Sequence, residues 1–368
     1  MVKSISITGS TGQLGFVTRA RLKYHYGHSV FGIDRNQFAQ PQALAEVVKR
    51  SDALVHLAGV IIADGVDLKE ANLAIARQVT AAIEQSESDV HMVYASSVRI
   101  HDDTEYGSAK RAVGDYFQKY CEDNNLPYSE IVFPNLYGEF SKPNYNNVTG
   151  TFAHRVANDQ KPEIHDVDKV LPLMSYLQAA DAIHDVVDNK SLGRICPEGT
   201  PITLGALAQR LADMKALYSQ GIVPDLRETI DLYLFNTLRI NLFPQMFPYP
   251  LVPKTDNRGS FIECLHERNG GQVSFSSTKP GVTRGNHFHF TKVERFTVLS
   301  GEATIRVRKL YDEHVHEFHV TGDTPVAVDM PTFHTHNIEN TGDTELLTLF
   351  WINESYDPEN PDTYPMDV

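Results

Sequence analysis

The order of two apolar patterns along the chain is the feature that most restricts its fold. Up to about residue 190, short apolar runs alternate with segments of helical periodicity. The runs read as strands buried on both faces, which predicts a parallel sheet covered by helices, a doubly wound α/β fold of the Rossmann type. We expect strands at 4–8, 28–33, 53–57, 91–95 and 128–133, and helices at 12–24, 42–49, 73–85 and 109–123.

The second pattern begins near residue 203. Two helical segments, at 204–219 and 226–241, lead into a proline-rich stretch at 242–254. Beyond it, short alternating strands are broken by Gly, Asn and Asp, which predicts an all-β barrel or sandwich. We therefore expect two domains, 1–242 and 243–368, and we expect the acidic segment after Asp357 to be solvated surface.

Composition excludes several classes of partner. The 368 residues include 33 Lys and Arg against 47 Asp and Glu, a formal net charge of −14. Nucleic-acid binding needs clustered basic residues, so it is disfavoured. No stretch approaches the ~18 apolar residues of a membrane-spanning helix, and the first residues lack the apolar core of a signal peptide. Three scattered cysteines favour a reducing compartment. We expect a soluble, cytoplasmic protein with no nucleic-acid or membrane partner.

A glycine-rich turn follows directly after the first expected strand. Its sequence is Gly9-Ser10-Thr11-Gly12-Gln13-Leu14-Gly15, at the opening of a helix. Such glycines allow a close backbone approach, so that the N–H groups of the helix N-terminus can bind a pyrophosphate. The turn predicts a dinucleotide site, against the alternative of a plain turn with helix-packing glycines. The small residues of Leu57-Ala58-Gly59, after the third strand, would leave room for the cofactor.

Two adjacent residues at the end of the second strand point to different cofactors. Asp34 can accept hydrogen bonds from both ribose hydroxyls, which favours NAD. Arg35 can pair with a 2′-phosphate, which favours NADP, or can be an ordinary surface charge. The residues alone leave this choice open.

Three polar residues further along form a candidate catalytic set. Tyr106 and Lys110 are spaced to stack on one face of a helix, and Ser97 ends the fourth strand. An ammonium beside a phenol favours the phenolate, so we expect Lys110 to lower the pKa of Tyr106. Ser97 would hold a substrate carbonyl oxygen while Tyr106 delivers the proton. The alternative is a surface pair with no catalytic role.

These motifs over residues 3–240 resemble the extended short-chain dehydrogenase/reductase superfamily, whose members mostly act on nucleotide sugars. The resemblance implies that Asn135, in a loop after the fifth strand, contacts substrate, and that Lys142 and Asn144 lie near the diphosphate or sugar. The 4,6-dehydratases of the superfamily carry an Asp-Glu pair directly after the active Ser or Thr. Here Val98-Arg99 follows Ser97, so dehydration is disfavoured and reduction or 4-epimerisation remains.

The second half contains a candidate metal site. His287 and His289 are at strand spacing on one face, Glu294 begins the next strand, and His336 comes from a later strand. Three imidazoles and a carboxylate facing a barrel interior suit zinc, iron, manganese or nickel. The alternative for each histidine is a satisfied core residue.

This part of the sequence resembles the cupin superfamily, which implies an all-β cupin barrel. Gly281, His287, His289, Glu294 and Gly301 match its first motif, and Pro331, His336 and Asn340 match its second. Phe333 stands where the second motif has glycine, so we expect the local turn to differ. We expect the neighbouring His334 on the surface.

A second likeness concerns the reaction of the barrel. The segment 256–261, which contains Arg258, is similar to a motif of nucleotide-sugar 3,5-epimerases. The run Arg284-Gly285-Asn286-His287 is similar to a second motif of these enzymes. The likeness makes Arg258 and Arg284 candidate substrate contacts and His287 the base. Because His287 is also an expected metal ligand, Lys292 is a candidate for moving the proton instead.

The whole chain resembles the CapF family of capsular-polysaccharide enzymes. The segments that carry this resemblance are 142–146, 256–261, 285–287 and 336–340. The resemblance implies a zinc-containing homodimer that uses NADPH on a UDP-2-acetamido-2,6-dideoxy-L-hexos-4-ulose. The cupin would epimerise C3 and the reductase domain would reduce C4, giving a UDP-N-acetyl-6-deoxy-L-talosamine, a precursor of UDP-N-acetyl-L-fucosamine for surface polysaccharide. Two alternatives remain open: a reductase whose cupin is only structural, and a 4-epimerase with tightly bound NAD.

Overall fold

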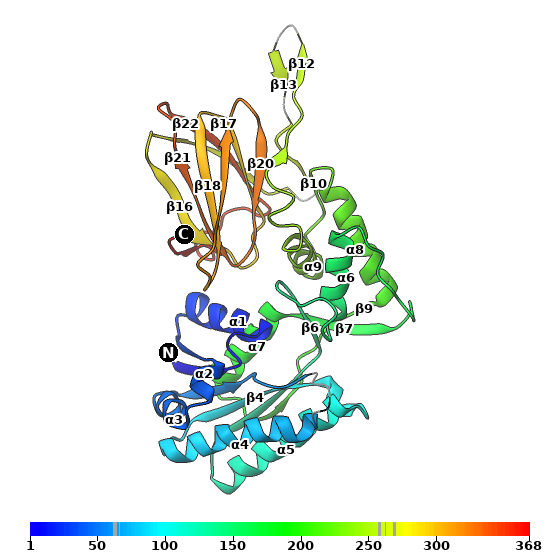
Figure 1. The fold of residues 1–368 in the computed structure, drawn as a ribbon, viewed down its shortest axis with the longest axis vertical. Coiled ribbons are helices and arrows are strands. Elements are labelled where there is room, and N and C mark those ends of the chain that lie inside the picture. Colours follow the sequence, from blue (N-terminus) through cyan, green and yellow to red (C-terminus); the bar gives the residue numbers. More distant parts are fainter. Residues whose placement is uncertain (62–64, 66, 257–258, 262, 268–269) are drawn as a thin grey trace. The chain divides into compact units, whose positions relative to one another are not determined.

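The computed structural model describes residues 1–368 except 62–64, 66, 257–258, 262 and 268–269 (Figure 1). The chain forms two compact units, one of Met1–Val148 with Asp166–Leu204 and one of Thr149–His165 with Gly205–Val368. The boundary expected between residues 242 and 243 falls inside the second unit, because the helices of 205–240 group with the strands that follow them. No helix in the described part of the chain is long and apolar enough to span a membrane.

The first unit is built on a six-stranded parallel sheet. Its strand order is β2-β1-β3-β4-β5-β8. The strands are β1 (Ser4–Thr8), β2 (Ser29–Ile33), β3 (Ala53–His56), β4 (His91–Ser97), β5 (Tyr128–Phe133) and β8 (Gly193–Ile195). The order reverses between β1 and β3, and ligands of doubly wound folds bind at the carboxyl ends of strands at such a switch point.

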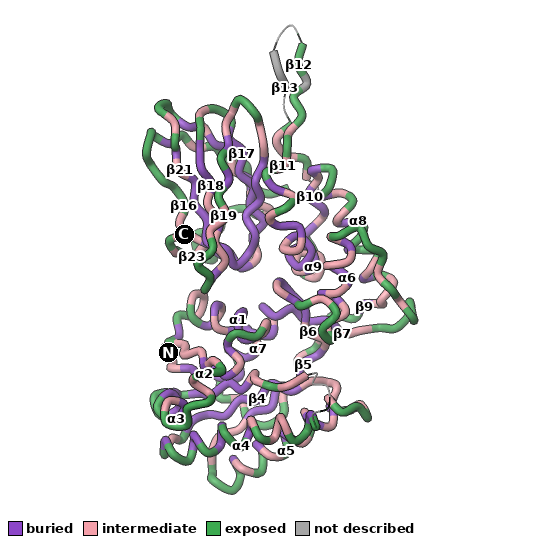
Figure 2. Tube along the Cα trace, viewed as in Figure 1, coloured by how far each residue is buried: buried purple, intermediate pink, exposed green. Residues whose placement is uncertain are grey.

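Helices cover both faces of this sheet, as the apolar pattern predicts. On one face pack α3 (Pro41–Lys49), α4 (Leu68–Ser86) and α5 (Glu105–Asp123). On the other pack α7 (Tyr176–Asn189) and the short π-helix η1 (Arg21–His25), which continues α1 (Gln13–Ala20). The central strands are buried between these layers, which Figure 2 shows for β4.

Shorter elements complete the first unit. After β2 comes α2 (Arg35–Phe38), and after β4 comes the 3₁₀ turn η2 (Val98–His101). A small mixed sheet has the order β6-β7-β9, formed by β6 (Asn135–Tyr137), β7 (Val170–Ser175) and β9 (Thr200–Thr203).

Two five-stranded antiparallel sheets form the barrel of the second unit. One has the order β11 (Tyr249–Pro250), β20 (Val326–Met330), β17 (Glu294–Ser300), β22 (Leu346–Ile352) and β15 (Gln272–Thr278). The other has the order β19 (Val315–Thr321), β18 (Glu302–Lys309), β21 (His334–Asn340), β16 (Thr283–Phe288) and β23 (Tyr364–Pro365). The expected fold class, a parallel α/β sheet followed by an all-β barrel, is confirmed.

The remaining elements of the second unit lie outside these sheets. They are α6 (Val148–Ala157), α8 (Leu204–Tyr218), α9 (Thr229–Arg239), the pair β10 (Ile222–Val223) and β14 (His266–Glu267), and the hairpin β12 (Lys254–Asp256) with β13 (Gly259–Phe261).

A buried ion pair connects α8 to the barrel. Arg295 of β17 donates from Nε and Nη2 to the two carboxylate oxygens of Asp329, over 2.6 and 3.0 Å, and both side chains are about 2% exposed or less. The hydroxyl of Tyr218, at the end of α8, donates to the same carboxylate. Burial disfavours the charge on Arg295, but Asp329 outweighs it and raises the pKa of the guanidinium.

We expect Asp329→Ala to lower the free energy of unfolding of the barrel by about 3–5 kcal/mol, because it leaves the Arg295 charge buried and unpaired. Trp351, the one tryptophan of the sequence, pairs with Arg295 across β17 and β22 and is 1% exposed, so its fluorescence in urea reports on this region. The control is Arg210→Ala, which breaks a 2.7 Å ion pair with Asp231 on the surface. It should change the same quantity by about 1 kcal/mol or less. Equal effects of the two substitutions would contradict the prediction.

Candidate functional site

The glycine turn of the first unit lies at the switch point between β1 and β3. Gly9 has a φ of 68°, and a Cβ added to it would lie 2.8 Å from the backbone N of Ala58. A Cβ on Gly15 would lie 2.1 Å from the carbonyl oxygen of Gly9. Glycine is therefore required at both positions by close backbone approach. The structure brings the predicted cofactor residues 9–15 next to Leu57 and Ala58, at the place where a dinucleotide binds in such folds.

Asp34 and Arg35 have different local roles. Asp34 is the N-cap of α2, where its carboxylate accepts a 2.8 Å hydrogen bond from the backbone N–H of Gln37. Arg35 is the first residue of α2 and is exposed. Arg19 of α1, which the sequence did not single out, also lies here: its Nη1 would lie 3.0 Å from a Cβ at Gly32 in β2, and Ser10 of the glycine turn would lie 2.9 Å from the same Cβ. Gly32 was the available signal, since a glycine inside a strand often marks a close approach.

The candidate catalytic set lies at the carboxyl end of β4. Ser97 ends this strand, and its Oγ accepts a hydrogen bond from the backbone N–H of Arg99. Tyr106 lies in the first turn of α5, which is capped by Thr104. Lys110 follows one turn later, and its Nζ donates over 2.8 Å to the carbonyl oxygen of Ala95 in β4. The same Nζ lies 6.0 Å from the ring centre of Tyr106.

The protonation of this set differs from the expected one. Burial raises the pKa of Tyr106 to about 12, with the charge of Arg99 opposing the effect. Burial lowers the pKa of Lys110 to about 8, with Glu130 opposing it. The expectation that Lys110 lowers the pKa of Tyr106 is therefore wrong for this arrangement, because the ammonium is bonded to a backbone carbonyl and not to the phenol. With this raised pKa, the phenol of Tyr106 is protonated at neutral pH.

The candidate substrate residues of the first unit lie in and after β6. Asn135 begins β6, and its Nδ2 donates to the carbonyl oxygen of Pro172 over 3.3 Å. Lys142 and Asn144 are exposed, with the Lys142 ammonium 5.8 Å from the ring centre of Tyr145. Arg258 lies outside the described residues.

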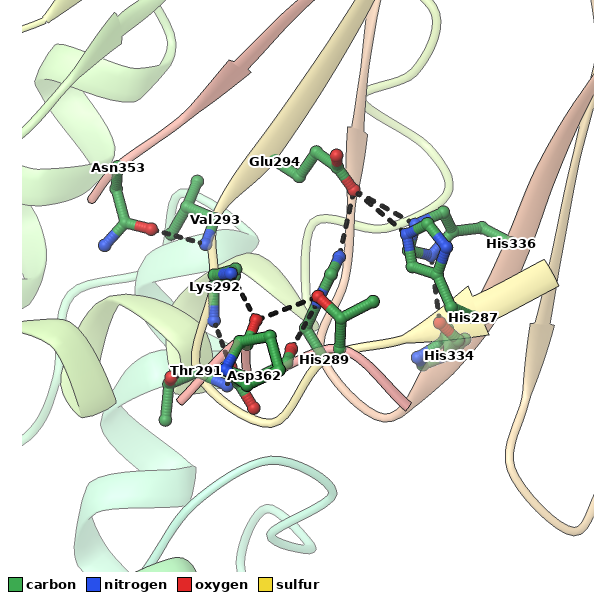
Figure 3. A network of polar contacts seen from close by, with 12 residues as sticks. His287, His289, Thr291, Lys292, Val293, Glu294, His334, His336, Asn353 and Asp362 are labelled. Atoms are coloured by element: carbon green, nitrogen blue, oxygen red, sulfur yellow. Dashed lines mark hydrogen bonds and ion pairs between the residues drawn. The ribbon is translucent and has the colours of Figure 1, made fainter. Parts of the chain in front are cut away.

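Four predicted metal ligands meet inside the barrel (Figure 3). Glu294 comes from one sheet, and His287 and His336 pair across β16 and β21 of the other. The ligand atoms of these residues and of His289 all lie within 4.8 Å of one another. The carboxylate Oε2 of Glu294 is 3.0 Å from Nε2 of both His289 and His336, and 3.9 Å from Nε2 of His287.

The orientation of two rings indicates that the cluster suits a cation. Nδ1 of His289 is 2.6 Å from the carbonyl oxygen of Asp362, and Nδ1 of His336 is 3.1 Å from that of His334. In a neutral imidazole that donates from Nδ1, the Nε2 lone pair then points at the Glu294 carboxylate, and a metal ion between them removes the repulsion. Where the rings instead carry a proton on Nε2 and donate it to the carboxylate, these hydrogen bonds hold the pKa of Glu294 well below its usual range despite burial. Burial lowers the pKa of His336 to about 4, which keeps this ring available as a ligand.

A β-bulge places Arg284 and His287 on the same side of the barrel wall. The register of β16 on β21 pairs Gly285 with Asn337 and then His287 with His336, so Asn286 is an extra residue. Asn286 has a φ of 60° and accepts a 2.8 Å hydrogen bond from Asn337. In a regular strand, residues three apart face opposite sides. With the bulge, both Arg284 and His287 line one pocket, together with Glu294, Phe296, Ile338 and Phe350.

The C-terminal segment contradicts an expectation, because part of it is buried. Asp362 is 8% exposed, and its carboxylate accepts hydrogen bonds from the backbone N–H groups of Phe290, Thr291 and Lys292, over 2.9–3.1 Å. This segment therefore fixes the loop between His289 and Glu294, and it supplies the carbonyl oxygen that orients His289. The acidic residues of this segment favoured the prediction of solvated surface, so the sequence did not indicate this role.

Lys292 does not reach the metal cluster. Its side chain is 3% exposed, and its ammonium donates to the carbonyl oxygen of Pro361 and lies 3.9 Å from Glu354. Figure 3 shows it on the Asp362 side of the loop. The geometry therefore gives no support for Lys292 as the proton carrier.

Two further expectations about the second motif are corrected. His334 is 4% exposed and not on the surface, and burial lowers its pKa to about 3. Phe333 adopts a φ of 58°, the left-handed conformation that glycine would take, so the turn is kept. Its ring is fully buried 5.2 Å from that of Phe290, and its N–H donates to the carbonyl oxygen of His289 over 2.9 Å. Packing and this hydrogen bond offset the backbone strain.

Comparison with known proteins assigns the first and the last part of the chain to two different families. Residues 5–195 match the NAD dependent epimerase/dehydratase family, and residues 254–364 match the family described as polysaccharide biosynthesis C-terminal domain. Over 368 residues the chain is 29% identical to a UDP-2-acetamido-2,6-beta-L-arabino-hexul-4-ose reductase of Pseudomonas aeruginosa, with 99% of this chain and 98% of the relative covered.

Solved structures give the same result. The capsular polysaccharide assembling protein CapF from Staphylococcus aureus is 31% identical, with a TM-score of 0.62 over 99% of this chain and 100% of that one. The UDP-N-acetylglucosamine 4-epimerase from Bacillus cereus is 20% identical over 58% of this chain and 82% of that one, with a TM-score of 0.52, a likeness of fold alone. The chain belongs to the NAD dependent epimerase/dehydratase family through its first half and, over its whole length, to the family of the capsular polysaccharide assembling protein CapF.

Proposed function

We propose that the chain is a bifunctional nucleotide-sugar enzyme. Its barrel epimerises C3 of a UDP-2-acetamido-2,6-dideoxy-L-hexos-4-ulose, and its parallel-sheet unit reduces the C4 ketone with NADPH. The observation that carries the proposal is the placement of Ser97, Tyr106 and Lys110 at the carboxyl end of β4, in the unit that holds the glycine turn. The name of the Pseudomonas relative, a 4-keto-sugar reductase, supports the same substrate class.

The order of the two reactions follows from the chemistry of the ketone. A carbonyl at C4 acidifies the hydrogen on C3, so inversion at C3 must come before the ketone is reduced. The product is a UDP-N-acetyl-6-deoxy-L-talosamine, en route to UDP-N-acetyl-L-fucosamine for surface polysaccharide.

In the reduction, the bound cofactor supplies a hydride to C4 of the sugar. Tyr106 gives its proton to the C4 oxygen, and Ser97 donates a hydrogen bond that holds this oxygen in place. The raised pKa of Tyr106 suits this direction of transfer, since the phenol stays protonated until the hydride arrives. The charge of Arg99, which lowers the pKa of Tyr106 against the effect of burial, then favours the phenolate.

In the barrel, His287, His289, Glu294 and His336 would hold a divalent metal, which we propose is zinc. The metal would supply Lewis-acid stabilisation of the negative charge on the C4 oxygen while C3 gives its proton to a base and takes a proton back on the opposite face. Arg284 binds the nucleotide sugar from the wall of the pocket. His287 is the cluster member with the most exposed side chain, 23%, so it is the ligand nearest to a substrate that enters this pocket.

We expect Tyr106→Phe to separate the two activities. In D₂O without NADPH, NMR should show deuterium at C3 of the 4-keto sugar with both wild type and variant. With NADPH, the variant should lose about 10²–10⁴-fold in the rate of cofactor oxidation, because it lacks the proton donor. Tyr128→Phe, which alters another partly buried tyrosine of the same unit, is the control and should keep both activities. NADPH oxidation by wild type without exchange at C3 would leave the barrel only structural, and no oxidation at all would favour a 4-epimerase with bound NAD.

Removing a ligand should abolish metal binding. We expect elemental analysis to find ~1 zinc per chain in wild type, and we expect His336→Ala to lose this zinc and the deuterium exchange at C3. Its dissociation constant for NADPH should stay the same. His319→Ala is the matched control, since His319 is an exposed histidine of β19 that pairs with Thr304. Full metal content in His336→Ala would contradict this ligand set.

The preference for NADPH should depend on Arg35. We expect Arg35→Ala to raise the KM for NADPH about 10-fold, the effect of one charge-assisted hydrogen bond to the 2′-phosphate. The KM for NADH should change little, because NADH lacks that phosphate. A parallel rise for both cofactors would indicate a general disturbance of α2 and not recognition of the phosphate.

A further inference from the structure

One buried hydroxyl joins two segments of the first unit that we assign to different ligands. Tyr176 opens α7 and is 4% exposed. Its hydroxyl oxygen lies 2.8 Å from Oε1 of Gln13, which belongs to the glycine turn and is the first residue of α1. It also lies 3.0 Å from Nδ2 of Asn147 and 3.3 Å from Oγ of Ser141. Both belong to the segment 138–147, which carries Lys142 and Asn144.

The hydrogen bonds run in one direction. The Nδ2 of Asn147 can only donate, so the tyrosine oxygen accepts from it, and the single phenolic proton goes to Oε1 of Gln13. This fixes the Gln13 amide with its Nε2 turned away from Tyr176. In the part of the chain that the structure describes, this buried Nε2 has no hydrogen-bond partner. A phosphate oxygen of a cofactor at the glycine turn would satisfy this donor.

The tyrosine ring also supports the same segment by packing. A Cβ added at Gly138 would lie 2.8 Å from Cδ2 of Tyr176, so the segment passes directly over the ring. The ring of Phe140 lies edge-on against Phe16 of α1, with 5.1 Å between centres. Tyr176 is itself held by a capping box at Ser175, which fixes the start of α7. The hydroxyl and the ring of Tyr176 therefore connect Gln13 to the segment 138–147 by direct contacts.

We propose that Tyr176 is a positioning residue that couples the binding of NADPH to the binding of the nucleotide sugar. Cofactor that fixes the Gln13 amide fixes the Tyr176 hydroxyl, which orders Asn147 and the segment that receives the sugar nucleotide. Coupling between sites is reciprocal, so the sugar nucleotide strengthens the binding of NADPH by the same factor. The inference rests on the proposed function, since it assigns the glycine turn to NADPH and the segment 138–147 to the nucleotide sugar.

The test measures, in the full-length protein, the factor by which one ligand changes the dissociation constant of the other. Dissociation constants are determined for NADPH alone, for UDP alone, and for each in the presence of saturating amounts of the other. In wild type we expect each ligand to tighten the other about 5-fold or more. In Tyr176→Phe, which keeps the ring and removes the hydroxyl, the factor should fall to within about 2-fold of unity, although each ligand alone still binds. If Tyr176 only supported the local structure, Tyr176→Phe would weaken the binding of each ligand alone. The factor by which one ligand tightens the other would then stay unchanged.

Two further variants make the test specific. Asn147→Ala removes the other end of the hydrogen-bond chain and should lower the factor in the same way. Tyr128→Phe removes a hydroxyl that donates to the carbonyl oxygen of Gly114 and touches neither segment, so it should keep the wild-type factor. An unchanged factor in Tyr176→Phe, or a factor of one in a wild type that binds both ligands, would overturn this inference and leave the proposed function standing. A wild type that does not bind NADPH would overturn both.

Discussion

Both units of this protein place charged side chains in their interiors, and each charge depends on a fixed partner there. Lys110 is bonded to the carbonyl oxygen of Ala95, Arg295 to Asp329, and the Glu294 carboxylate to the histidine cluster. A buried charge without a partner costs several kcal/mol. The backbone around each charge must therefore hold its partner in place.

In the barrel, this requirement is met by irregular backbone. The bulge at Asn286 brings His287 opposite His336 while Arg284 lines the same pocket, and the left-handed turn at Phe333 brings its N–H to the carbonyl oxygen of His289. Bulges and strained residues gather at functional sites because regular strands allow only one spacing of side chains on a face. The cluster is thus built from departures from ideal strand geometry.

In the parallel-sheet unit, the candidate site depends on close backbone approach and on a polar network. Gly9 and Gly15 let the turn pack against itself and against Ala58, which leaves the start of α1 facing the switch point. Tyr176 then joins this turn to the segment 138–147 through Gln13 and Asn147. The proposed order of reactions, inversion at C3 before reduction at C4, makes such communication between cofactor and sugar useful, because the reduction needs both ligands in place together.

The sequence by itself predicted the fold class, the glycine turn, the Ser97, Tyr106 and Lys110 set and the four residues of the metal cluster, because each is recognised from one or two short motifs. Only the tertiary structure decided the raised pKa of Tyr106, the place of Lys292 away from the cluster and the burial of Asp362. These depend on groups far apart in the chain, such as His289 and the carbonyl of Asp362, which are 73 positions apart in the sequence. Local pattern reports which side chains share a face of an element, whereas burial and pairing are set by whatever the fold packs against that face.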